Sequence, residues 1–382
     1  MRMSLLGVIR MNACYHTYEP DRVKTPDRHV RGVGSEGNGM SGAQQRPRKV
    51  TSQDVARAVG VSQSAVSIAL SNHWRGRLAA GTVDEIRQMA AKMHYTPNVA
   101  ARNLRQGTGG LVFMLVPTLG NPMFAEIHAG ASAEGVKHGR GLVVWPVPDG
   151  GSPAADALSG ANGVIGCSLD PATLTRLANG QPTVAIDMDP AVDCPVVNAD
   201  LGSGMHEALN YLKSLGHSSV LHFAGDPASW TFRRRSESFD EHSSALGIQG
   251  ARIRVAPTVA DAYRAANNLI AGYGSRTPWT AVVCDTDQIA TGMYFAADRL
   301  GWKIPQQISV VSFENSDVAE LLQPSLTSVS IPAKALGERA MQKLITLTAG
   351  GALEVDTLPT ALIVRESASK SCTMGISLDA TE

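Results

Sequence analysis

Three polar side chains in one short segment are spaced so that they could contact DNA bases. Gln63, Ser64 and Ser67 follow a predicted helix cap and would lie in the first turns of a short helix. A glutamine amide can bind adenine through two hydrogen bonds, and a serine hydroxyl can reach a base or a phosphate. The spacing therefore predicts a recognition helix for the major groove, with a plain helical hairpin as the alternative interpretation.

The residues around this segment carry the signals of two helices joined by a tight turn. Thr51 can cap the first helix, with Asp54 completing an approximate capping box, Gly60 can end it, and Ser62 can cap the second. A third helix is expected from Thr82 onward, because apolar residues recur there at three- and four-residue spacing. Small or apolar residues stand where the crossed helices must approach one another: Ala56, Val61, Val66 and Ala69.

Charge is distributed unevenly, although the whole chain has a formal net charge of +0. Between Arg46 and Arg105 there are ten Lys and Arg residues against three Asp and Glu, a net charge of +7. From Gly109 to the end there are 18 basic and 27 acidic residues, a net charge of −9. A basic head on an acidic body favours a polyanionic partner at the N-terminal end, although ordinary surface charge is the plainer explanation.

The rest of the chain has the alternation that is typical of α/β proteins. Short apolar runs predict strands at 111–116, 142–145, 163–165, 183–186, 220–223, 281–284 and 308–313. Helical periodicity predicts helices at 124–138, 205–215, 263–270 and 289–300. Strands that alternate with helices over this length predict parallel sheets covered by helices on their faces.

Several functional classes are disfavoured by what the sequence lacks. The five cysteines are odd in number, widely spaced and without a C-x-x-C pair, which indicates neither a zinc site nor a disulfide framework and fits a reducing cytoplasm. No apolar run reaches the length of about 18 residues expected of a membrane span. No phosphate-binding glycine loop, G-x-S-x-G or H-E-x-x-H motif is present, so we expect no enzyme and no cofactor.

The stretch from Val50 to Asn72, followed by Tyr95-Thr-Pro-Asn-Val-Ala-Ala-Arg-Asn-Leu104, resembles the head and hinge of the LacI/GalR family of bacterial repressors. The likeness continues to about Ser367. Ile68 departs from the family, which usually has arginine there, so the family's operator sequence does not transfer to this chain. The resemblance implies DNA contacts from Thr51, Ser62, Gln63, Ser64, Ser67, Ile68 and Asn72.

The resemblance also implies a hinge helix at 97–108 that forms only on DNA. A helix this short is unstable alone in water. Leu104 matches the leucine that the family wedges into the minor groove to kink the operator. A simple linker helix is the alternative. The hinge residues expected to touch DNA are Asn98, Ala101, Leu104 and Arg105.

Beyond the hinge, the resemblance implies a two-lobed effector domain with the fold of periplasmic sugar-binding proteins. Matching motifs include Asn121-Pro-Met-Phe124 and Arg235-Ser-Glu-Ser-Phe239. Trp230 is either a stacking platform for a sugar or a lobe-surface or core tryptophan, and Asp287 is either a ligand contact, an ion-pair partner or a helix cap. The residues expected to face the effector are Asn121, Phe124, Asp187, Trp230, Arg235, Thr286, Asp287 and Glu314.

We therefore predict a cytoplasmic transcriptional repressor that binds a near-palindromic DNA operator as a homodimer and responds to a small carbohydrate. An effector-independent or protein-regulated transcription factor is the alternative, and a sugar-transport protein is disfavoured because it would have a signal peptide and no DNA head. The predicted domains are a disordered leader at 1–45 (or a true start at Met40), a helix-turn-helix domain at 46–96, the hinge at 97–108, an effector and dimerisation domain at 109–368 and a tail at 369–382.

Overall fold

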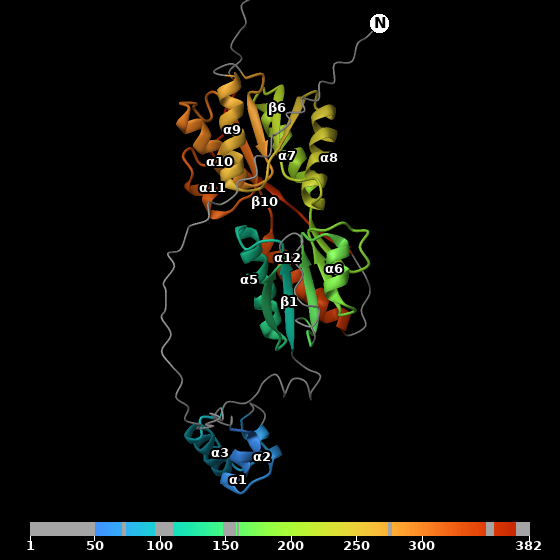
Figure 1. Ribbon diagram of the computed structural model, residues 1–382, viewed down its shortest axis with the longest axis vertical. Helices are drawn as coiled ribbons and strands as arrows, with labels where there is room; N and C mark the ends of the chain where they lie inside the picture. Colours follow the sequence, from blue (N-terminus) through green and yellow to red (C-terminus); the bar gives the residue numbers. More distant parts are fainter. Residues whose placement is uncertain are drawn as a thin grey trace, which may run out of the picture. The chain divides into compact units, whose positions relative to one another are not determined.

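The computed structural model describes residues 50–70, 74–95, 110–147, 158, 160–273, 277–348 and 355–371. The chain divides into two compact units, Met1–Pro97 and Asn98–Glu382. The predicted leader, the predicted hinge and the end of the predicted tail lie outside the described residues, so these boundaries stay predictions. The fold class expected from the sequence, a small helical head and a larger α/β part with two sheets, is confirmed (Figure 1).

The head consists of α1 (Ser52–Val59), α2 (Gln63–Ala69) and α3 (Ala80–Lys92). The predicted capping box between Thr51 and Asp54 is present, and Ser62 caps α2 by accepting a hydrogen bond from the backbone N–H of Ala65. Gly60 ends α1 in the left-handed conformation, with φ at +76°. The third helix begins at Ala80, two residues before the predicted start. Its N-cap, Ala79, has no side chain that can cap, so the sequence carries no signal there.

The larger unit contains two six-stranded sheets, each belonging to one lobe. The first lobe has the strand order β11-β5-β4-β3-β1-β2 and all of its pairs are parallel. Its strands are β1 (Leu111–Val116), β2 (Gly141–Pro146), β3 (Gly163–Cys167), β4 (Thr183–Ile186), β5 (Val196–Ala199) and β11 (Val355–Leu358). Its helices are α5 (Pro122–Lys137), α6 (Pro171–Ala178) and α12 (Ala333–Thr348).

The second lobe has the order β12-β10-β9-β8-β6-β7, in which only the edge strand β12 runs antiparallel to its neighbour. Its strands are β6 (Ser219–Ala224), β7 (Gln249–Arg254), β8 (Ala281–Cys284), β9 (Ser309–Glu314), β10 (Thr327–Ser330) and β12 (Ala361–Ile363). Its helices are α7 (Leu201–Ser214), α8 (Trp230–Ala245), α9 (Val259–Tyr273), α10 (Asp287–Arg299) and α11 (Asp317–Leu321).

The chain crosses between the lobes three times, after β5, after β10 and between β11 and β12. Two of these crossings are bonded together, because the backbone N–H of Asp200 donates to the carbonyl of Leu358 over 2.8 Å and the Thr360 hydroxyl donates to the carbonyl of Asp200 over 2.9 Å. Pro359 lies between the last two strands, β11 and β12, and these strands join different sheets.

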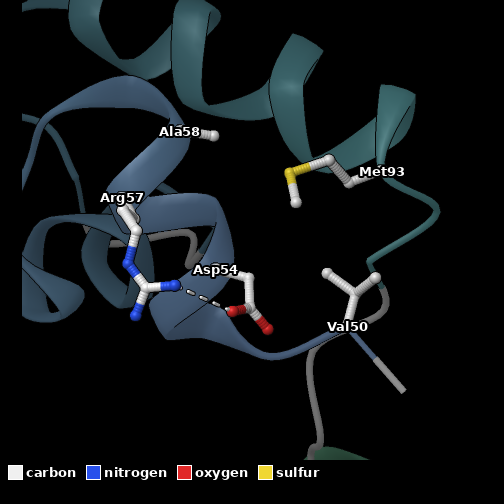
Figure 2. Close-up of a pocket in the computed structure, with 5 residues that line it drawn as sticks. All are labelled: Val50, Asp54, Arg57, Ala58 and Met93. Carbon is white, nitrogen blue, oxygen red and sulfur yellow. Dashed lines mark ion pairs between the residues drawn. The ribbon is translucent and has the colours of Figure 1, made fainter. Parts of the chain in front are cut away.

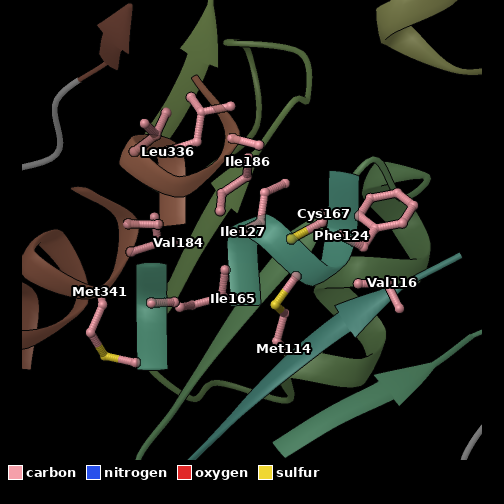
Figure 3. Packing of buried hydrophobic residues seen from close by; sticks show 14 of the residues in the cluster. Met114, Val116, Phe124, Ile127, Ile165, Cys167, Val184, Ile186, Leu336 and Met341 are labelled. Carbon is pink, nitrogen blue, oxygen red and sulfur yellow. The ribbon is translucent and has the colours of Figure 1, made fainter. Parts of the chain in front are cut away.

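The core of the first lobe lies between its sheet and the helices α5 and α12 (Figure 3). These helices pack closely because glycines stand at their contact. A Cβ on Gly130 would lie 1.9 Å from the carbonyl oxygen of Lys334, and one on Gly337 would lie 1.9 Å from that of Ile127. The packing therefore fixes α5, whose first turn follows Asn121. In the described part of the chain, no helix has the length and apolar content that a membrane crossing requires.

Candidate functional site

The predicted recognition residues of the head fall into two groups. Ser64 and Ser67 are exposed on α2, whereas Ile68 is half-buried. Gln63 is half-buried as well, and its side-chain amide donates to the hydroxyl of Ser52 over 2.8 Å, which ties it to the start of α1. Ser64 and Ser67 are therefore the exposed side chains on the predicted recognition helix, and Asn72 lies outside the described residues.

Thr51 and Ser62 have structural tasks in addition to their predicted contact with DNA. Each hydroxyl accepts a backbone N–H in the first turn of its helix, at 3.3 Å for Thr51 and 3.1 Å for Ser62. A capped helix start holds its remaining N–H groups and the positive end of its dipole in one direction. Both caps thus position a helix terminus that could face a phosphate, and the contact itself stays a prediction.

A tryptophan and two arginines, which sequence reasoning missed as a group, support the end of α2. The Arg87 Nε–H of α3 donates to the carbonyl of Ala69 over 3.1 Å at the last turn of α2. The guanidinium groups of Arg87 and Arg75 lie 5.8 and 5.9 Å from the centre of the Trp74 ring. A lone tryptophan in a cationic loop was the available signal, and the structure assigns it to holding α2 against α3.

The head also has an open hollow of about 400 Å³ between α1 and the end of α3 (Figure 2). An ion pair of 3.6 Å between Asp54 and Arg57 lies along it. None of the predicted DNA-binding residues that the structure describes lines this hollow, although its lining residue Asp54 is hydrogen-bonded to Thr51. Its lining residues are Val50, Asp54, Arg57, Ala58 and Met93.

In the larger unit, four predicted effector residues lie near the carboxyl ends of strands or on the helix beside them, and the lobes meet there. The side-chain amide of Asn121, which follows β1, donates to Glu314 Oε1, at the end of β9, over 2.8 Å. Asp187 follows β4 and accepts a hydrogen bond of 2.8 Å from Ser168. Together with Arg235 of α8, these side chains are called here the inter-lobe cluster: Asn121, Ser168, Asp187, Arg235 and Glu314.

Backbone strain is concentrated in this cluster. Ser168, Asp187 and Glu314 have positive φ values of +49°, +55° and +104°, and Asn315 has +56°. Left-handed backbone is costly for residues with a Cβ, and such residues collect at binding sites. The turns that end β3, β4 and β9 are therefore built to aim side chains at one place rather than to relax.

Glu314 is the most perturbed ionisable group of the cluster. Its side chain is buried, and burial raises the pKa of Glu314 to about 8, helped by the negative charge of Asp287. The positive charge of Arg235 and the hydrogen bond from Asn121 oppose this shift of the pKa. The carboxyl group is therefore poised to exchange a proton when a ligand or a movement of the lobes changes its surroundings.

Arg235 is held on three sides and is only 1% exposed. One terminal nitrogen donates to the backbone carbonyl of Asp285, and the guanidinium lies 4.7 Å from the ring centre of Phe313 and 5.8 Å from that of Phe232. Its Nε has no hydrogen-bond partner among the described residues. A buried donor without a partner is costly, so this nitrogen is available to a bound acceptor.

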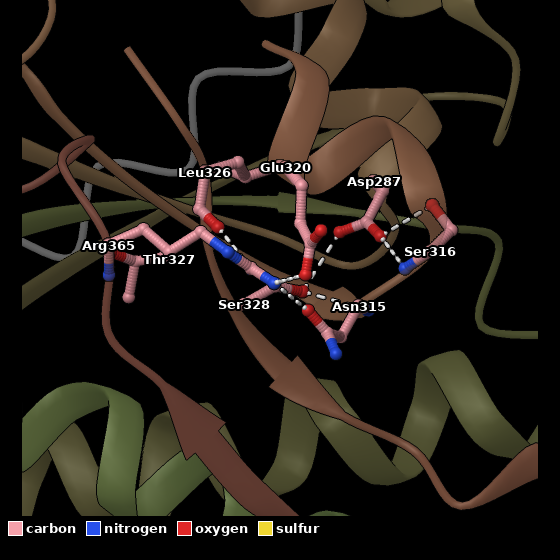
Figure 4. A network of polar contacts seen from close by, with 8 residues as sticks. All are labelled: Asp287, Asn315, Ser316, Glu320, Leu326, Thr327, Ser328 and Arg365. Atoms are coloured by element: carbon pink, nitrogen blue, oxygen red, sulfur yellow. Dashed lines mark hydrogen bonds and ion pairs between the residues drawn. The ribbon is translucent and has the colours of Figure 1, made fainter. Parts of the chain in front are cut away.

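Asp287 has a different place from the one expected. It is fully buried, and its carboxylate accepts a hydrogen bond of 2.5 Å from Ser312. It also accepts hydrogen bonds from Ser328 (2.9 Å) and from both the backbone and the hydroxyl of Ser316 (2.6 and 2.8 Å) (Figure 4). Burial raises the pKa of Asp287, and the bonds from the serines act against that. Neither an ion pair nor a helix cap describes it, because it ties the turn after β9 to β10 and α10.

The same polar network extends to Arg365, which follows β12 (Figure 4). The Ser328 hydroxyl that donates to Asp287 also accepts the backbone N–H of Asn315 over 3.0 Å. Arg365 donates to the side chain of Asn315 over 2.7 Å and to the carbonyl of Leu326 over 2.8 Å. Sequence reasoning did not assign Arg365 a role, and the structure uses it to hold the strained turn beside Glu314.

Two further residues expected at the effector have structural roles. Phe124 is 6% exposed and belongs to the first-lobe core (Figure 3), so a ring at this position need not face a ligand. The hydroxyl of Thr286 caps α10 by accepting the N–H of Ile289 over 3.1 Å. Packing accounts for the place of Phe124 and helix capping for that of Thr286, and the contact of either residue with an effector stays a prediction.

Trp230 begins α8 in the second lobe, yet it packs against the core of the first lobe. Of the alternatives left open for it, this contact favours a tryptophan at the surface between the lobes. Two polar contacts bridge the lobes as well: Arg233 pairs with Asp189 over 3.2 Å, and the Gln288 amide donates to the carbonyl of Gly120 over 2.7 Å.

Two family models match the chain. Residues 51–98 match the model described as bacterial regulatory proteins, lacI family, and residues 209–368 match that of a periplasmic binding protein-like domain. The chain is 25% identical over 321 residues to the HTH-type transcriptional repressor CytR of Escherichia coli K12, covering 79% of this chain and 91% of the relative. It is 28% identical over 312 residues to the regulator MalR of Streptomyces coelicolor, covering 76% and 88%.

Solved structures share the fold over most of the chain. A lac repressor dimer bound to operator and the anti-inducer ONPF matches with a TM-score of 0.73 at 22% identity, covering 84% of this chain and all of that one. A CelR–cellobiose complex matches with a TM-score of 0.62 at 22% identity over the same shares. A LacI family regulator from Enterococcus faecium with bound ribose matches with a TM-score of 0.63 at 21% identity, covering 68% and 99%.

Proposed function

Because the chain belongs to the LacI family of DNA-binding transcriptional regulators, we propose that it is a repressor whose operator affinity is set by a small effector. The effector is a sugar or sugar derivative bound at the inter-lobe cluster. The observation that carries this proposal is the meeting of Asn121 and Glu314 from opposite lobes, on strained turns and over 2.8 Å. A ligand that replaces this bond couples directly to the relation between the lobes.

The cluster has the chemistry that a polyol requires. A sugar hydroxyl both donates and accepts, so it pairs well with a carboxylate on one side and an amide or guanidinium on the other. Asp187 and Glu314 offer acceptors, Asn121 and the free Nε of Arg235 offer donors, and all but Asn121 are nine-tenths buried or more. Relatives in this fold have been solved with cellobiose and ribose bound, which supports the same ligand class here.

For the DNA arm, we propose that two copies of the chain pair and place two α2 helices in successive half-sites of a near-palindromic operator. Ser64 and Ser67 reach bases or phosphates, with Thr51, Ser62, Gln63, Ile68 and Asn72 beside them. The hinge residues Asn98, Ala101, Leu104 and Arg105 enter the minor groove. The lac repressor dimer on its operator supports this arrangement by its fold. A regulator that acts on chromosomal DNA works in the cytoplasm.

The test of the effector site is a thermal-shift screen of the purified full chain against neutral sugars, amino sugars, sugar phosphates and nucleosides. A ligand at a hundredfold excess over its Kd stabilises the folded protein by about 2.7 kcal/mol. We expect at least one neutral sugar to raise the Tm of the wild type and to leave Arg235→Ala unchanged. Site-to-site coupling of about 1–3 kcal/mol should then change operator affinity when that sugar is added.

A second candidate function has its own support. Thr286, Asp287, Asn121 and Glu314 are already engaged in hydrogen bonds within the chain. A site in which most of the polar groups bond to one another fits a regulator that needs no effector. A folded wild type that no compound stabilises, and that still binds its operator, would establish this second function and contradict the first.

A further inference from the structure

Three charged or polar side chains form a row across the second sheet, beneath the inter-lobe cluster. Arg252 of β7 and His222 of β6 are partners in register, and His222 is in turn in register with Val283 of β8. Asp285 follows two residues after Val283, so it lies on the same face of the sheet. None of the three was assigned a role by sequence reasoning, and the DNA and effector proposals do not use them.

The hydrogen bonds along this row have a single direction. The Nε–H of Arg252 lies 3.3 Å from Nδ1 of His222, and Nε2 of His222 lies 2.8 Å from Oδ1 of Asp285. Arginine can only donate, so Nδ1 of His222 accepts and the ring proton is on Nε2. His222 therefore donates to the carboxylate of Asp285, and both side chains are 0% exposed.

Further contacts with neighbouring residues hold these three side chains in place. The rings of His222 and Phe239 stack with centroids 4.7 Å apart, and the Arg252 guanidinium lies 5.8 Å from the centre of the same Phe239 ring. Asp285 Oδ2 accepts the backbone N–H of Gly225 over 2.8 Å. The carboxylate of Asp285 is thus bonded at both oxygens and cannot turn without losing a partner.

Asp285 connects this row of side chains to the inter-lobe cluster through its backbone carbonyl. Its carbonyl accepts a hydrogen bond from a terminal nitrogen of Arg235. The Nε of Arg235 has no hydrogen-bond partner among the described residues. A shift of the Asp285 carbonyl would move the guanidinium relative to Phe313 and relative to Glu314. A group that binds ligand gains affinity when its supporting contacts lock it in place beforehand.

We propose that His222 and Asp285 are positioning residues for Arg235, and that Arg252 fixes the ring form that lets them act. This inference rests on the proposed function, because it assumes that Arg235 contacts the effector. It adds that the specificity of the effector site is set partly by a buried pair with no contact to the ligand. The pair links Arg252, a partly buried arginine on the edge strand β7, to the inter-lobe cluster.

The first experiment needs no ligand. Nitrogen-15 spectra of the full chain resolve buried arginine Nε–H groups, and the signal of Arg235 is assigned by its loss in Arg235→Lys. In His222→Phe, which keeps the stack on Phe239 but removes both ring nitrogens, we expect hydrogen exchange at Arg235 Nε–H to accelerate by about tenfold or more. His222→Gln, whose amide can still donate to Asp285, should restore slow exchange.

Two controls separate positioning from general destabilisation. The Nε–H of Arg87, which donates to Ala69 in the head, should exchange at the same rate in every variant. Arg252→Met removes the donor to His222 together with the Arg252 hydrogen bonds to Ser236 and Asp240 of α8, so unchanged exchange in this variant counts against the row should His222→Phe fail to fold. Unchanged exchange at Arg235 in Arg252→Met and in any folded His222→Phe protein would overturn the proposal.

A second experiment uses the sugar that gives the largest shift in the thermal screen. The positioning role predicts that the sugar gives no thermal shift with Arg235→Ala and binds about tenfold more weakly to His222→Phe than to the wild type. It also predicts that His222→Gln restores the affinity for the sugar. Full affinity in His222→Phe with a silent Arg235→Ala contradicts this inference alone. A full response in Arg235→Ala contradicts the proposed effector site itself, whatever the spectra show.

Discussion

The head and the inter-lobe cluster are built in opposite ways. In the head, the contacts that position α2 join residues close in the chain: Thr51 with Asp54, Ser62 with Ala65, Gln63 with Ser52 eleven positions away, and Arg87 with Ala69 eighteen positions away. In the cluster, the bond that brings the lobes together joins Asn121 to Glu314 across 193 positions. The first site is specified by local signals and the second only by the completed fold.

The two regions also treat polar groups differently. Ser64 and Ser67 are exposed to water, so they cost nothing to leave unbonded until DNA arrives. Glu314 and Arg235 are buried, and each must be bonded, shifted in pKa or left at a cost. Surface recognition in the head is therefore separable from stability, whereas recognition in the cluster is linked to it.

The largest expected effect is on how the stability of the larger unit depends on pH through Glu314 of the inter-lobe cluster. Burial raises the pKa of Glu314 to about 8 from an ordinary value of 4.5, so the folded chain holds this proton more tightly than the unfolded chain. The stability from Glu314 is complete below about pH 4.5 and is lost as the pH rises toward 8. The loss is on the order of 5 kcal/mol, since each pKa unit corresponds to 1.36 kcal/mol.

The measurement is the free energy of unfolding in urea for the wild type and Glu314→Gln at pH 5 and pH 8.5. Glutamine keeps an acceptor for Asn121 and does not titrate, so the difference between the two proteins reports the titration of Glu314 together with its interaction with Asp287. We expect the wild type to lose stability relative to Glu314→Gln between the two pH values. If the free energy of unfolding depended on pH equally in both proteins, burial would not raise the pKa of Glu314.

Asp287→Ala should have the next largest effect, about 3 kcal/mol of lost stability in the larger unit. The substitution leaves three serine hydroxyls and the Ser316 N–H without their common acceptor. Asp317→Ala is the matched control, an aspartate in the first turn of the neighbouring short helix α11. Equal stability of the two variants in urea would contradict the structural role that we assign to Asp287.

The features predicted correctly from the sequence are those that local signals specify, as in the head. Both caps of the head, its αL glycine and the seven strands with clear apolar runs are confirmed to within two residues. The edge strand β7, whose arginines at 252 and 254 interrupt its apolar pattern, and the short β5 and β10 were not identified. The four-residue strands β5 (VVNA) and β10 (TSVS) contain Asn, Thr and Ser, so neither shows the continuous apolar run by which the other strands were predicted.

For the candidate site, motif positions identified which turns would meet but not what each side chain would do there. Asp187, Arg235 and Glu314 are brought together as expected. Thr286 and Asp287 come from the same motif. Thr286 accepts a hydrogen bond from the N–H of Ile289, and Asp287 accepts hydrogen bonds from three serines. Those serines are at 312, 316 and 328, so the role of Asp287 depends on partners that its own segment does not contain.

A smaller effect tests the local character of the head. Gly60→Ala places a Cβ at φ +76°, where nothing lies within 4 Å, so the cost is backbone strain alone, about 1–2 kcal/mol. Gly81→Ala, inside α3 and equally open, should instead stabilise the head by up to about 1 kcal/mol. Hydrogen exchange of head peptides from the full chain measures both. Changes of the same sign would contradict the assigned backbone conformations.

The smallest effect on stability should accompany a clear effect on DNA. Ser64→Ala with Ser67→Ala changes two exposed side chains, so we expect the stability of the head to change by no more than about 0.5 kcal/mol. Affinity for DNA selected from a random pool by the wild type should fall by about 1–3 kcal/mol, with base preference relaxed where the serines contact. Gln88→Ala, exposed on α3, is the control and should keep wild-type affinity. A double variant that binds the selected DNA as tightly as the wild type would move recognition away from this face of α2. The base contacts would then have to come from the half-buried Gln63 and Ile68, and the head would resemble the inter-lobe cluster in linking recognition to packing.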